Sequence, residues 1–157
     1  MFCKFKMKDT NEGKGADMIR KAQEKDESAI LQLLCELEET QFSKERFHEL
    51  YLYDLKDERH ACFVYEENDQ ISGMIHLQRL HPWHHHNEVM EIMELIVDQD
   101  ARSSGIGHQL FTYAQQYAKE KGCEQIELAT NQRRKRAHAF YERQGMLQSH
   151  YSYTKKL

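Results

Sequence analysis

The chain has 157 residues, 39% of them hydrophobic and 31% charged, which suffices for one domain with one sizeable core. Its formal net charge of -4 gives no electrostatic case for a nucleic-acid partner. No run approaches the roughly 18 apolar residues of a membrane span, and the first residues lack the apolar core of a signal peptide. The four cysteines are widely spaced without a CxxC pair. We therefore expect a cytoplasmic protein with reduced thiols, without a disulfide framework or zinc site.

The N-terminal part of the sequence divides at about residue 17. Residues 1–17 contain glycines and basic residues without periodicity, so we expect a flexible extension ahead of a single domain over 18–157. The alternation in residues 18–22 predicts a short strand. Apolar residues at helical spacing then predict a helix over 24–40, with Asp26 or Ser28 as its cap.

A second helix and a hairpin follow. Residues 43–55 have a helical pattern that begins with Ser43, a suitable cap. Apolar runs on either side of the polar turn at 67–70 predict a hairpin over 60–80. The histidine-rich stretch 81–87, which holds the only proline, is predicted to be a loop.

The second half alternates strands with helices. We expect a buried strand over 88–97, a helix over 105–122 that stops at Gly122, a strand over 124–130, a helix over 133–145 and one or two closing strands over 146–157. This order combines a hairpin with a βαβ unit. It predicts an α/β (α+β) fold with a mixed, mostly antiparallel sheet of about six to seven strands, flanked on both faces by about four helices.

The loop between the buried strand and the third long helix has an unusual composition. Arg102, Gly105 and Gly107 stand at the start of a helix, where backbone N–H groups and the helix dipole attract anions. Glycines let the main chain approach a phosphate, and arginine adds a fixed charge. No Lys-Ser/Thr pair completes a P-loop, and no third glycine completes a dinucleotide fingerprint. From spacing alone, a phosphate site and a simple tight turn are both open interpretations.

The pattern is more specific when its neighbours are included. The run 102–107, Arg-Ser-Ser-Gly-Ile-Gly, resembles the R-x-x-G-x-G signature of the GNAT superfamily of N-acetyltransferases. Asn131 and the run 137–145, which contains Phe-Tyr-Glu, are similar to that superfamily's second signature, and the element order agrees from residue 18 to 157. The C-terminal part, the segment at 33–42 and the histidine-rich loop are also similar to aminoalkylphosphonate N-acetyltransferases.

This resemblance implies acetyl-CoA as cosubstrate and assigns residues to it. The pyrophosphate would lie on the loop and helix start, while the pantetheine arm would lie along the backbone of the preceding strand. Asn131 would contact pantetheine, and Arg134, with Arg133, would reach the phosphates. The implied cofactor-binding residues are Leu95, Ile96, Val97, Arg102, Ser103, Ser104, Gly105, Ile106, Gly107, His108, Asn131 and Arg134. Ser103 departs from the family, which often has glycine there, and it would stiffen the loop.

Acetyl transfer to an amine requires a base and an acid. An alkylammonium has a pKa near ~10.4 and must lose a proton before it attacks, so a carboxylate with a raised pKa is a suitable base. The resemblance favours Glu91, with Glu94 as runner-up if a bulge turns it to the same face; the alternative is that these glutamates and Glu88 are solvated or paired. Tyr141 is the implied acid for the leaving thiolate, and its alternative role is that of a core tyrosine.

The acceptor is less well determined. Residues 81–86, with Arg79, could bind a metal, contact an anionic substrate or form a plain surface loop; we assign no metal ligand there. The favoured function is transfer of acetyl from acetyl-CoA to the primary amine of a small, anionic molecule such as an aminoalkylphosphonate. The alternatives are acetylation of peptides or proteins, a non-catalytic acyl-CoA-binding regulator and, least favoured, a nucleotide-binding regulator. We leave a homodimer open.

Overall fold

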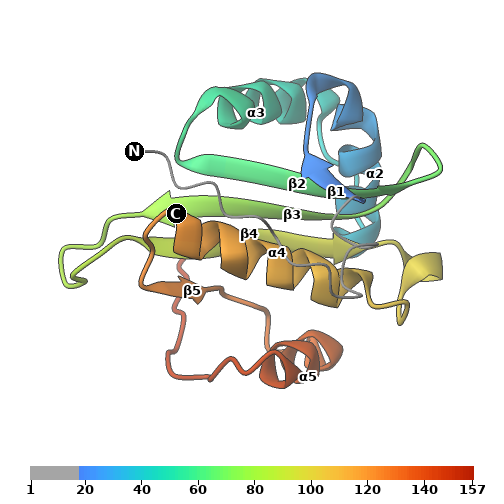
Figure 1. Cartoon of the computed structure of the whole chain (residues 1–157). Coiled ribbons are helices and arrows are strands. Elements are labelled where there is room, and N and C mark those ends of the chain that lie inside the picture. Colours follow the sequence, from blue (N-terminus) through green and yellow to red (C-terminus); the bar gives the residue numbers. More distant parts are fainter. Residues whose placement is uncertain (1–17) are drawn as a thin grey trace, which may run out of the picture.

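A five-stranded sheet forms the centre of the molecule, whose computed structural model describes residues 18–157 (Figure 1). The strands lie side by side in chain order: β1 Ile19–Lys21, β2 His60–Glu67, β3 Gln70–Leu80, β4 Val89–Val97 and β5 Gln125–Glu127. The first four pair antiparallel, and β5 pairs parallel with β4. The predicted mixed, mostly antiparallel sheet is confirmed, while the expectation of a flexible extension over 1–17 lies outside the described residues.

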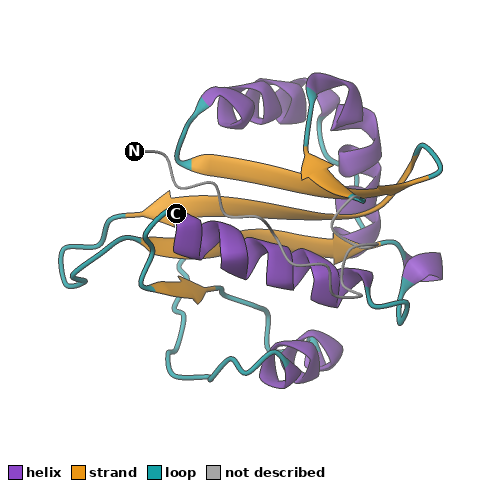
Figure 2. Cartoon of the chain, in the orientation of Figure 1, coloured by secondary structure: helices purple, strands orange, loops and turns teal. Residues whose placement is uncertain are grey.

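Helices cover both faces of this sheet, as predicted (Figure 2). Two α-helices lie over one face, a third lies over the other, and the fourth lies beyond β5 on the side of the third. They are α2 Glu27–Glu38, α3 Lys44–Lys56, α4 Ile106–Glu120 and α5 Lys135–Arg143. Two 3₁₀ turns, η1 Glu24–Asp26 and η2 Gln99–Ala101, precede α2 and α4. Within residues 18–157, no helix combines the length and the apolarity needed to cross a bilayer.

Local signals in the sequence account for several of these boundaries. The Ser43 hydroxyl accepts a hydrogen bond from the Arg46 amide at 3.2 Å, which caps α3 as predicted. The predicted hairpin of β2 and β3 is also confirmed. Its turn residues Asn68 and Asp69 have φ of 51° and 60°, the left-handed values that a two-residue hairpin turn requires and that asparagine and aspartate tolerate.

The start of α2 uses its aspartate differently from the prediction. Asp26 stands at the N-cap, but its carboxylate bonds no helix amide. It accepts hydrogen bonds from the Arg20 guanidinium at 2.7 and 2.9 Å and from the Gln23 amide at 2.8 Å. The Arg20 bonds hold the pKa of this buried carboxyl below its usual value. The ion pair therefore attaches the helical layer to β1 where a simple cap was expected.

Two separate apolar clusters hold the layers together. One joins α4 and α5 to the sheet and includes Leu110, Phe111 and Ala114, all fully buried. The other joins α2 and α3 to the opposite face through Ile30 and Tyr51. The close packing of α4 explains a glycine in β3. A Cβ on Gly73 would lie 3.0 Å from Ile106 Cγ2 and 3.1 Å from Leu110 Cδ1, so this glycine lets the first turn of α4 lie on the strand.

The closing strands predicted for residues 146–157 do not form, which corrects the expected six to seven strands to five. This segment has no helix or strand, although its polar and apolar residues alternate. An alternating pattern forms a strand when one face is covered and the backbone finds a partner. Here Tyr151 and Tyr153 are 81% and 91% exposed, and β5, the neighbouring edge, is only three residues long.

Candidate functional site

The loop that leads into α4 has a strained backbone. Gly105, the residue before the helix, has φ of 90°, which glycine adopts without a steric penalty. Ser103 has φ of 70°, in the left-handed region that side chains with a Cβ disfavour by roughly 1–2 kcal/mol. The GNAT signature that this loop resembles often has glycine at the position of Ser103. The positive φ supplies the physical reason for that preference.

The first turn of α4 presents free backbone donors. The first bond inside the helix runs from the Gln109 amide to the Gly105 carbonyl at 3.0 Å. The amides of Ile106, Gly107 and His108 therefore point out of the helix end, where the macrodipole is positive. Gly107 is also packed closely, because a Cβ there would lie 3.4 Å from the Phe140 ring. Three of the predicted cofactor-binding residues thus supply donors at one anion-attracting helix end.

Hydrogen bonds attach this loop to the end of β4. The Arg102 Nε donates to the carbonyl of Val97 at 3.3 Å. The Ser104 hydroxyl donates to the Ala101 carbonyl at 2.5 Å. The His108 imidazole pairs with Gln144 beyond α5 at 2.7 Å, which links the helix start to the second signature. Strand, loop and helix therefore form one connected cradle, in which the exposed Arg102 has further donors for a phosphate.

Strand β4 separates from β5 partway along its length. The two strands pair only from Val89 to Glu91, whereas β4 continues to Val97 in pairing with β3. Beyond Glu91 the edge of β4 that faces β5 is open, so its backbone groups are available to an extended ligand. Leu95, Ile96 and Val97 lie on this open stretch. It runs directly toward the cradle at the start of α4.

A bulge in β4 changes which side chains share a face. Leu77 pairs with Ile92 and His76 pairs with Glu94, so Met93 has no partner on β3. Glu91 and Glu94, three residues apart, consequently lie on the same face, toward α2 and α3. From the sequence, we expected Glu94 to share the face of Glu91 only if the strand contained a bulge. The structure contains this bulge.

Glu88, just before β4, and the two glutamates within β4 differ in their partners. Glu88 forms an ion pair with Arg79 at 3.3 Å. Glu94 accepts a hydrogen bond from His76 at 2.8 Å. Among residues 18–157, Glu91 has no ion-pair partner; burial, and to a lesser extent the charge of Glu127, raises the pKa of its carboxyl. The alternative role as paired charges thus holds for Glu88 and Glu94, while the role of Glu91 as a base stays a prediction.

Tyr141 lies in α5 on the side that faces α4. Its ring is tilted 54° to that of Phe111, with centroids 6.4 Å apart, and it forms an edge contact with Phe140. Burial raises the pKa of its phenol, while the positive charge of Arg134 lowers it by a smaller amount. A phenol with a raised pKa stays protonated and can donate a proton or hydrogen bond. The structure is compatible with both predicted roles, the acid and the core tyrosine.

The other two predicted cofactor-binding residues, Asn131 and Arg134, lie in the turn that leads into α5. Asn131 accepts the Arg133 amide on its side-chain oxygen at 3.0 Å, and its carbonyl accepts from the Arg134 amide at 2.9 Å. The Arg134 guanidinium donates to Glu38 of α2 at 2.6 Å. Asn131 therefore shapes the turn into the helix, and Arg134 is attached to α2. Any contact of either residue with a bound cofactor remains a prediction.

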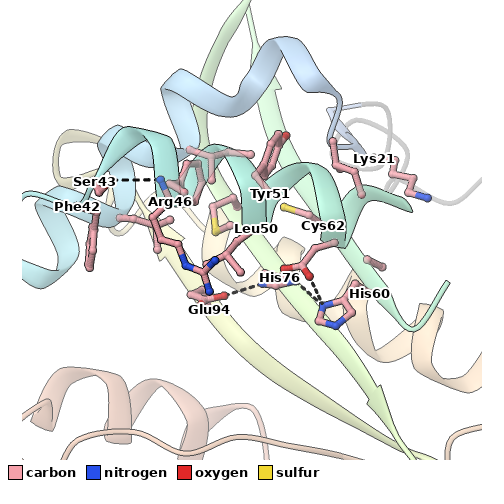
Figure 3. A pocket seen from close by; sticks show the side chains of 17 residues that line it. Lys21, Phe42, Ser43, Arg46, Leu50, Tyr51, His60, Cys62, His76 and Glu94 are labelled. Atoms are coloured by element: carbon pink, nitrogen blue, oxygen red, sulfur yellow. Dashed lines mark hydrogen bonds and ion pairs between the residues drawn. The ribbon is translucent and has the colours of Figure 1, made fainter. Parts of the chain in front are cut away.

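A cavity of about 320 Å³ lies between α3 and the same sheet face that carries Glu91 and Glu94 (Figure 3). Most of its wall is apolar and comes from α2, α3 and the strands. Its polar lining consists of Lys21, Ser43, Arg46, Asp54, His60, His76 and Glu94, together with Tyr51. The helix over this face thus leaves room for a small molecule.

Four of these polar groups form one cluster at the cavity wall. His60 Nδ1 lies 3.1 Å from His76 Nε2, and both nitrogens lie 3.7 Å from oxygens of Asp54. Glu94 forms a hydrogen bond with the other ring nitrogen of His76, Nδ1. Sequence reasoning missed this cluster because its members lie on α3, β2, β3 and β4. The hairpin turn at 68–69 was the one available signal, since it places His60 beside His76.

The histidine-rich loop 81–87 lies at the opposite end of β4 from the phosphate cradle. His85 is paired with Glu124, which also accepts the Asn87 amide at 3.1 Å. Trp83 is fully exposed. The loop is thus attached to the turn after α4. Glu88 connects the loop to Arg79. It forms an ion pair with Arg79, and its Oε1 lies 3.9 Å from Nδ1 of His81 in the loop.

Comparison with known proteins gives consistent matches. The sequence profile of the acetyltransferase (GNAT) family matches residues 28–146. An aminoalkylphosphonate N-acetyltransferase of Salmonella typhimurium is 35% identical over 139 residues, covering 88% of this chain and 90% of the relative. A transcriptional regulator from Bacillus halodurans superposes with a TM-score of 0.82 at 26% identity, over 88% and 98% of the two chains. Glucosamine-6-phosphate N-acetyltransferase from Arabidopsis thaliana superposes with a TM-score of 0.75 at 20% identity, over 88% and 96%.

Proposed function

Since the chain belongs to the acetyltransferase (GNAT) family, whose members typically use acetyl-CoA, we propose that it acetylates the primary amine of a small anionic molecule. The observation that carries this proposal is the separation of β4 from β5 at Glu91. An extended thioester can lie along the open edge of β4 with its pyrophosphate on the start of α4. Its reactive end then lies near Glu91.

The donor half of the proposal rests on backbone groups. The amides of Ile106, Gly107 and His108 would bind the pyrophosphate, with charge added by Arg102. Backbone groups of Leu95, Ile96 and Val97 would bind the pantetheine arm, and one amide of this stretch would stabilise the oxyanion of the tetrahedral intermediate. Asn131 and Arg134 would complete the cofactor contacts.

The chemical step removes two protons from the acceptor nitrogen, one before and one after its attack, and supplies one proton to the sulfur. Glu91, directly or through a water, takes a proton from the ammonium group, and the free amine attacks the thioester carbonyl carbon. The carbon–nitrogen bond forms, the attached nitrogen gives up its second proton to solvent, the tetrahedral intermediate collapses, and the carbon–sulfur bond breaks. Tyr141 gives its proton to the departing thiolate and regains one from solvent, or stabilises the thiolate by a hydrogen bond. The products are an N-acetylated amine and CoA.

The acceptor half rests on the cavity beneath α3. A cavity of about 320 Å³ that Arg46, His60 and His76 help to line suits a small acceptor with an anionic group. The relative from Salmonella typhimurium is named for aminoalkylphosphonates, which combine a primary amine with an anionic group. We therefore propose an aminoalkylphosphonate or a similar anionic amine as the acceptor.

Thiol release from acetyl-CoA tests this proposal directly. The purified chain is assayed with aminomethylphosphonate, 1-aminoethylphosphonate, uncharged alkylamines of matched length and a peptide with a free N-terminus. We expect turnover with the phosphonates at a kcat/KM well above that of the uncharged amines. Turnover with the peptide alone would refute the small acceptor, and binding of acetyl-CoA without turnover on any amine would indicate a regulator.

A further inference from the structure

The cavity between α3 and the sheet has more room than the smallest anionic amines need. Its volume is about 320 Å³. At about 30 Å³ for each water-sized group, this volume holds roughly ten non-hydrogen atoms. Aminomethylphosphonate, in which one methylene joins the phosphonate to the amine, fills only part of that space. The rest of the cavity is therefore available to a further part of the acceptor.

Much of the cavity wall is apolar, including two residues that carry polar atoms. The Tyr51 hydroxyl donates to the Gln23 carbonyl at 2.6 Å, so its polar atom is satisfied and the ring contributes apolar surface. Burial raises the pKa of the Cys62 thiol to about 12, and a neutral thiol behaves as a small hydrophobic group. A polar group placed against this surface would lose hydrogen bonds to water without replacing them. With Tyr51 and Cys62, the apolar wall consists of Ile30 and Leu34 of α2, Phe47 and Leu50 of α3, and Met74 of β3.

Several polar groups of the cavity lie together on the strands, near the proposed base. Glu94 accepts a hydrogen bond from His76 at 2.8 Å, and His60 lies 3.1 Å from the other ring nitrogen of His76. Glu94 and Glu91 pair with His76 and Gln78, two residues apart on β3, so they lie about 7 Å apart along the sheet. Both charged ends of a short acceptor can therefore bind in this region. The remaining atoms of a larger acceptor then extend toward the apolar wall.

Given the proposed function, we infer that the acceptor carries an alkyl or aromatic substituent on the carbon that bears its amine, and that this substituent binds the apolar wall. Two partly exposed side chains of the cavity support this assignment. Phe42 and Leu50 are 42% and 44% exposed (Figure 3), whereas Ile30 and Met74 are 1% and 2% exposed. Apolar surface in contact with water favours a ligand that covers it. An apolar substituent covers these side chains, and a second charged group would not be stabilised there.

The test compares two isomers that differ only in where their carbon atoms lie. In 1-aminobutylphosphonate a propyl group branches from the amine carbon, whereas in 4-aminobutylphosphonate the same carbons separate the amine from the phosphonate. Calorimetric titration of the full chain, with and without CoA, measures both Kd values without any turnover. We expect the 1-amino isomer to bind at least about tenfold more tightly, and to gain about fourfold over 1-aminoethylphosphonate for each added methylene. Equal Kd values for the two isomers, or no binding of either, would overturn the inference.

A variant of the apolar wall locates the substituent. Leu50→Ser places a polar side chain at a partly exposed position of the wall, and should weaken binding of the 1-amino isomer by at least about fivefold. The 4-amino isomer should change by a smaller factor. Tyr53→Ser, on the same helix but not among the residues that line the cavity, is the matched control and should keep the wild-type preference. A wild-type preference in Leu50→Ser would refute the apolar wall as the binding site.

Steady-state kinetics separates this inference from the proposed function on which it rests. Thiol release from acetyl-CoA is measured with aminomethylphosphonate and with both isomers, and we expect the highest kcat/KM for the 1-amino isomer. Turnover of aminomethylphosphonate with equal kcat/KM for the two isomers would overturn the apolar subsite and leave the proposed function intact. Turnover on no amine, with the calorimetric preference for the 1-amino isomer retained, would count against the proposed function alone.

Discussion

The two faces of the central sheet are packed in different ways. Under α4 the interface is apolar and closed, and Leu110, Phe111 and Ala114 are fully buried. Under α3 the interface contains a cavity, and the helix carries Leu50 and Tyr53 with 44% and 62% of their surface exposed. The polar groups of the sheet interior, including His76 and Glu94, lie on this second face.

We interpret this difference as a separation of roles, in which one face stabilises the fold and the other carries the polar groups. Polar and charged groups on a buried sheet face cost free energy unless they are paired or used, and here they gather where packing is incomplete. The closed face in turn holds α4 rigidly against Gly73, and this fixes the helix end that would receive a phosphate. In the proposed function, one face would position the cofactor and the other would leave room for the acceptor.

The largest expected effect is a loss of stability on the closed face. Phe111→Ala removes a fully buried ring and should lower the free energy of unfolding by about 3–5 kcal/mol. Leu50→Ala, on the face with the cavity, is the matched change and should cost less than about 1 kcal/mol. Urea unfolding followed by circular dichroism measures both. Equal losses would mean that the two faces contribute alike and would break the comparison.

A smaller effect is expected from the tyrosine of α5. Tyr141→Phe keeps the ring that packs against Phe111 and removes only the hydroxyl, so stability should change little. If the phenol is the acid, kcat should fall by about a hundredfold, while acetyl-CoA affinity stays the same. Steady-state kinetics and calorimetric titration separate the two quantities. Wild-type kcat in this variant would leave Tyr141 as a core residue.

The smallest predicted change concerns the strained serine of the cradle. Ser103→Gly removes the penalty of a positive φ and should raise the free energy of unfolding by up to about 1 kcal/mol. Ser104→Gly, one residue later, serves as the control, because Ser104 is not among the residues with positive φ and donates to the Ala101 carbonyl. Thermal unfolding compares them. A destabilised Ser103→Gly variant would show that the serine side chain contributes more than its backbone costs.

Elements defined by short-range signals were predictable from the sequence. Three examples are the cap at Ser43, the turn at Asn68 and Asp69, and the glycine before α4. Each acts within a few residues, so the residue type at that position determines the local structure. The closing strands were not predictable, because alternation in residues 146–157 cannot show whether a partner strand is present. The exposed tyrosines there have no such partner within the described chain.

The candidate site also has one part that the sequence predicts and another that it does not. The phosphate cradle is contiguous in sequence, and its signature could be recognised from residues 102–107. The cluster of Asp54, His60 and His76 depends on the register between strands and on a helix that crosses them. The bulge at Met93, which sets the face of Glu94, has no clear marker in an apolar strand. Such features follow from tertiary packing and become visible only in the structure.

The most direct test of the central proposal compares Glu91→Gln with wild type in the pH dependence of kcat. Glu91 must be ionised to accept a proton, and burial raises its pKa, so wild-type kcat should fall as the pH drops through a value above the usual carboxyl range. The variant should lose this acid limb and at least about a hundredfold in kcat, with acetyl-CoA affinity unchanged. A variant with the rate and pH profile of wild type would contradict the assignment of Glu91 as the base.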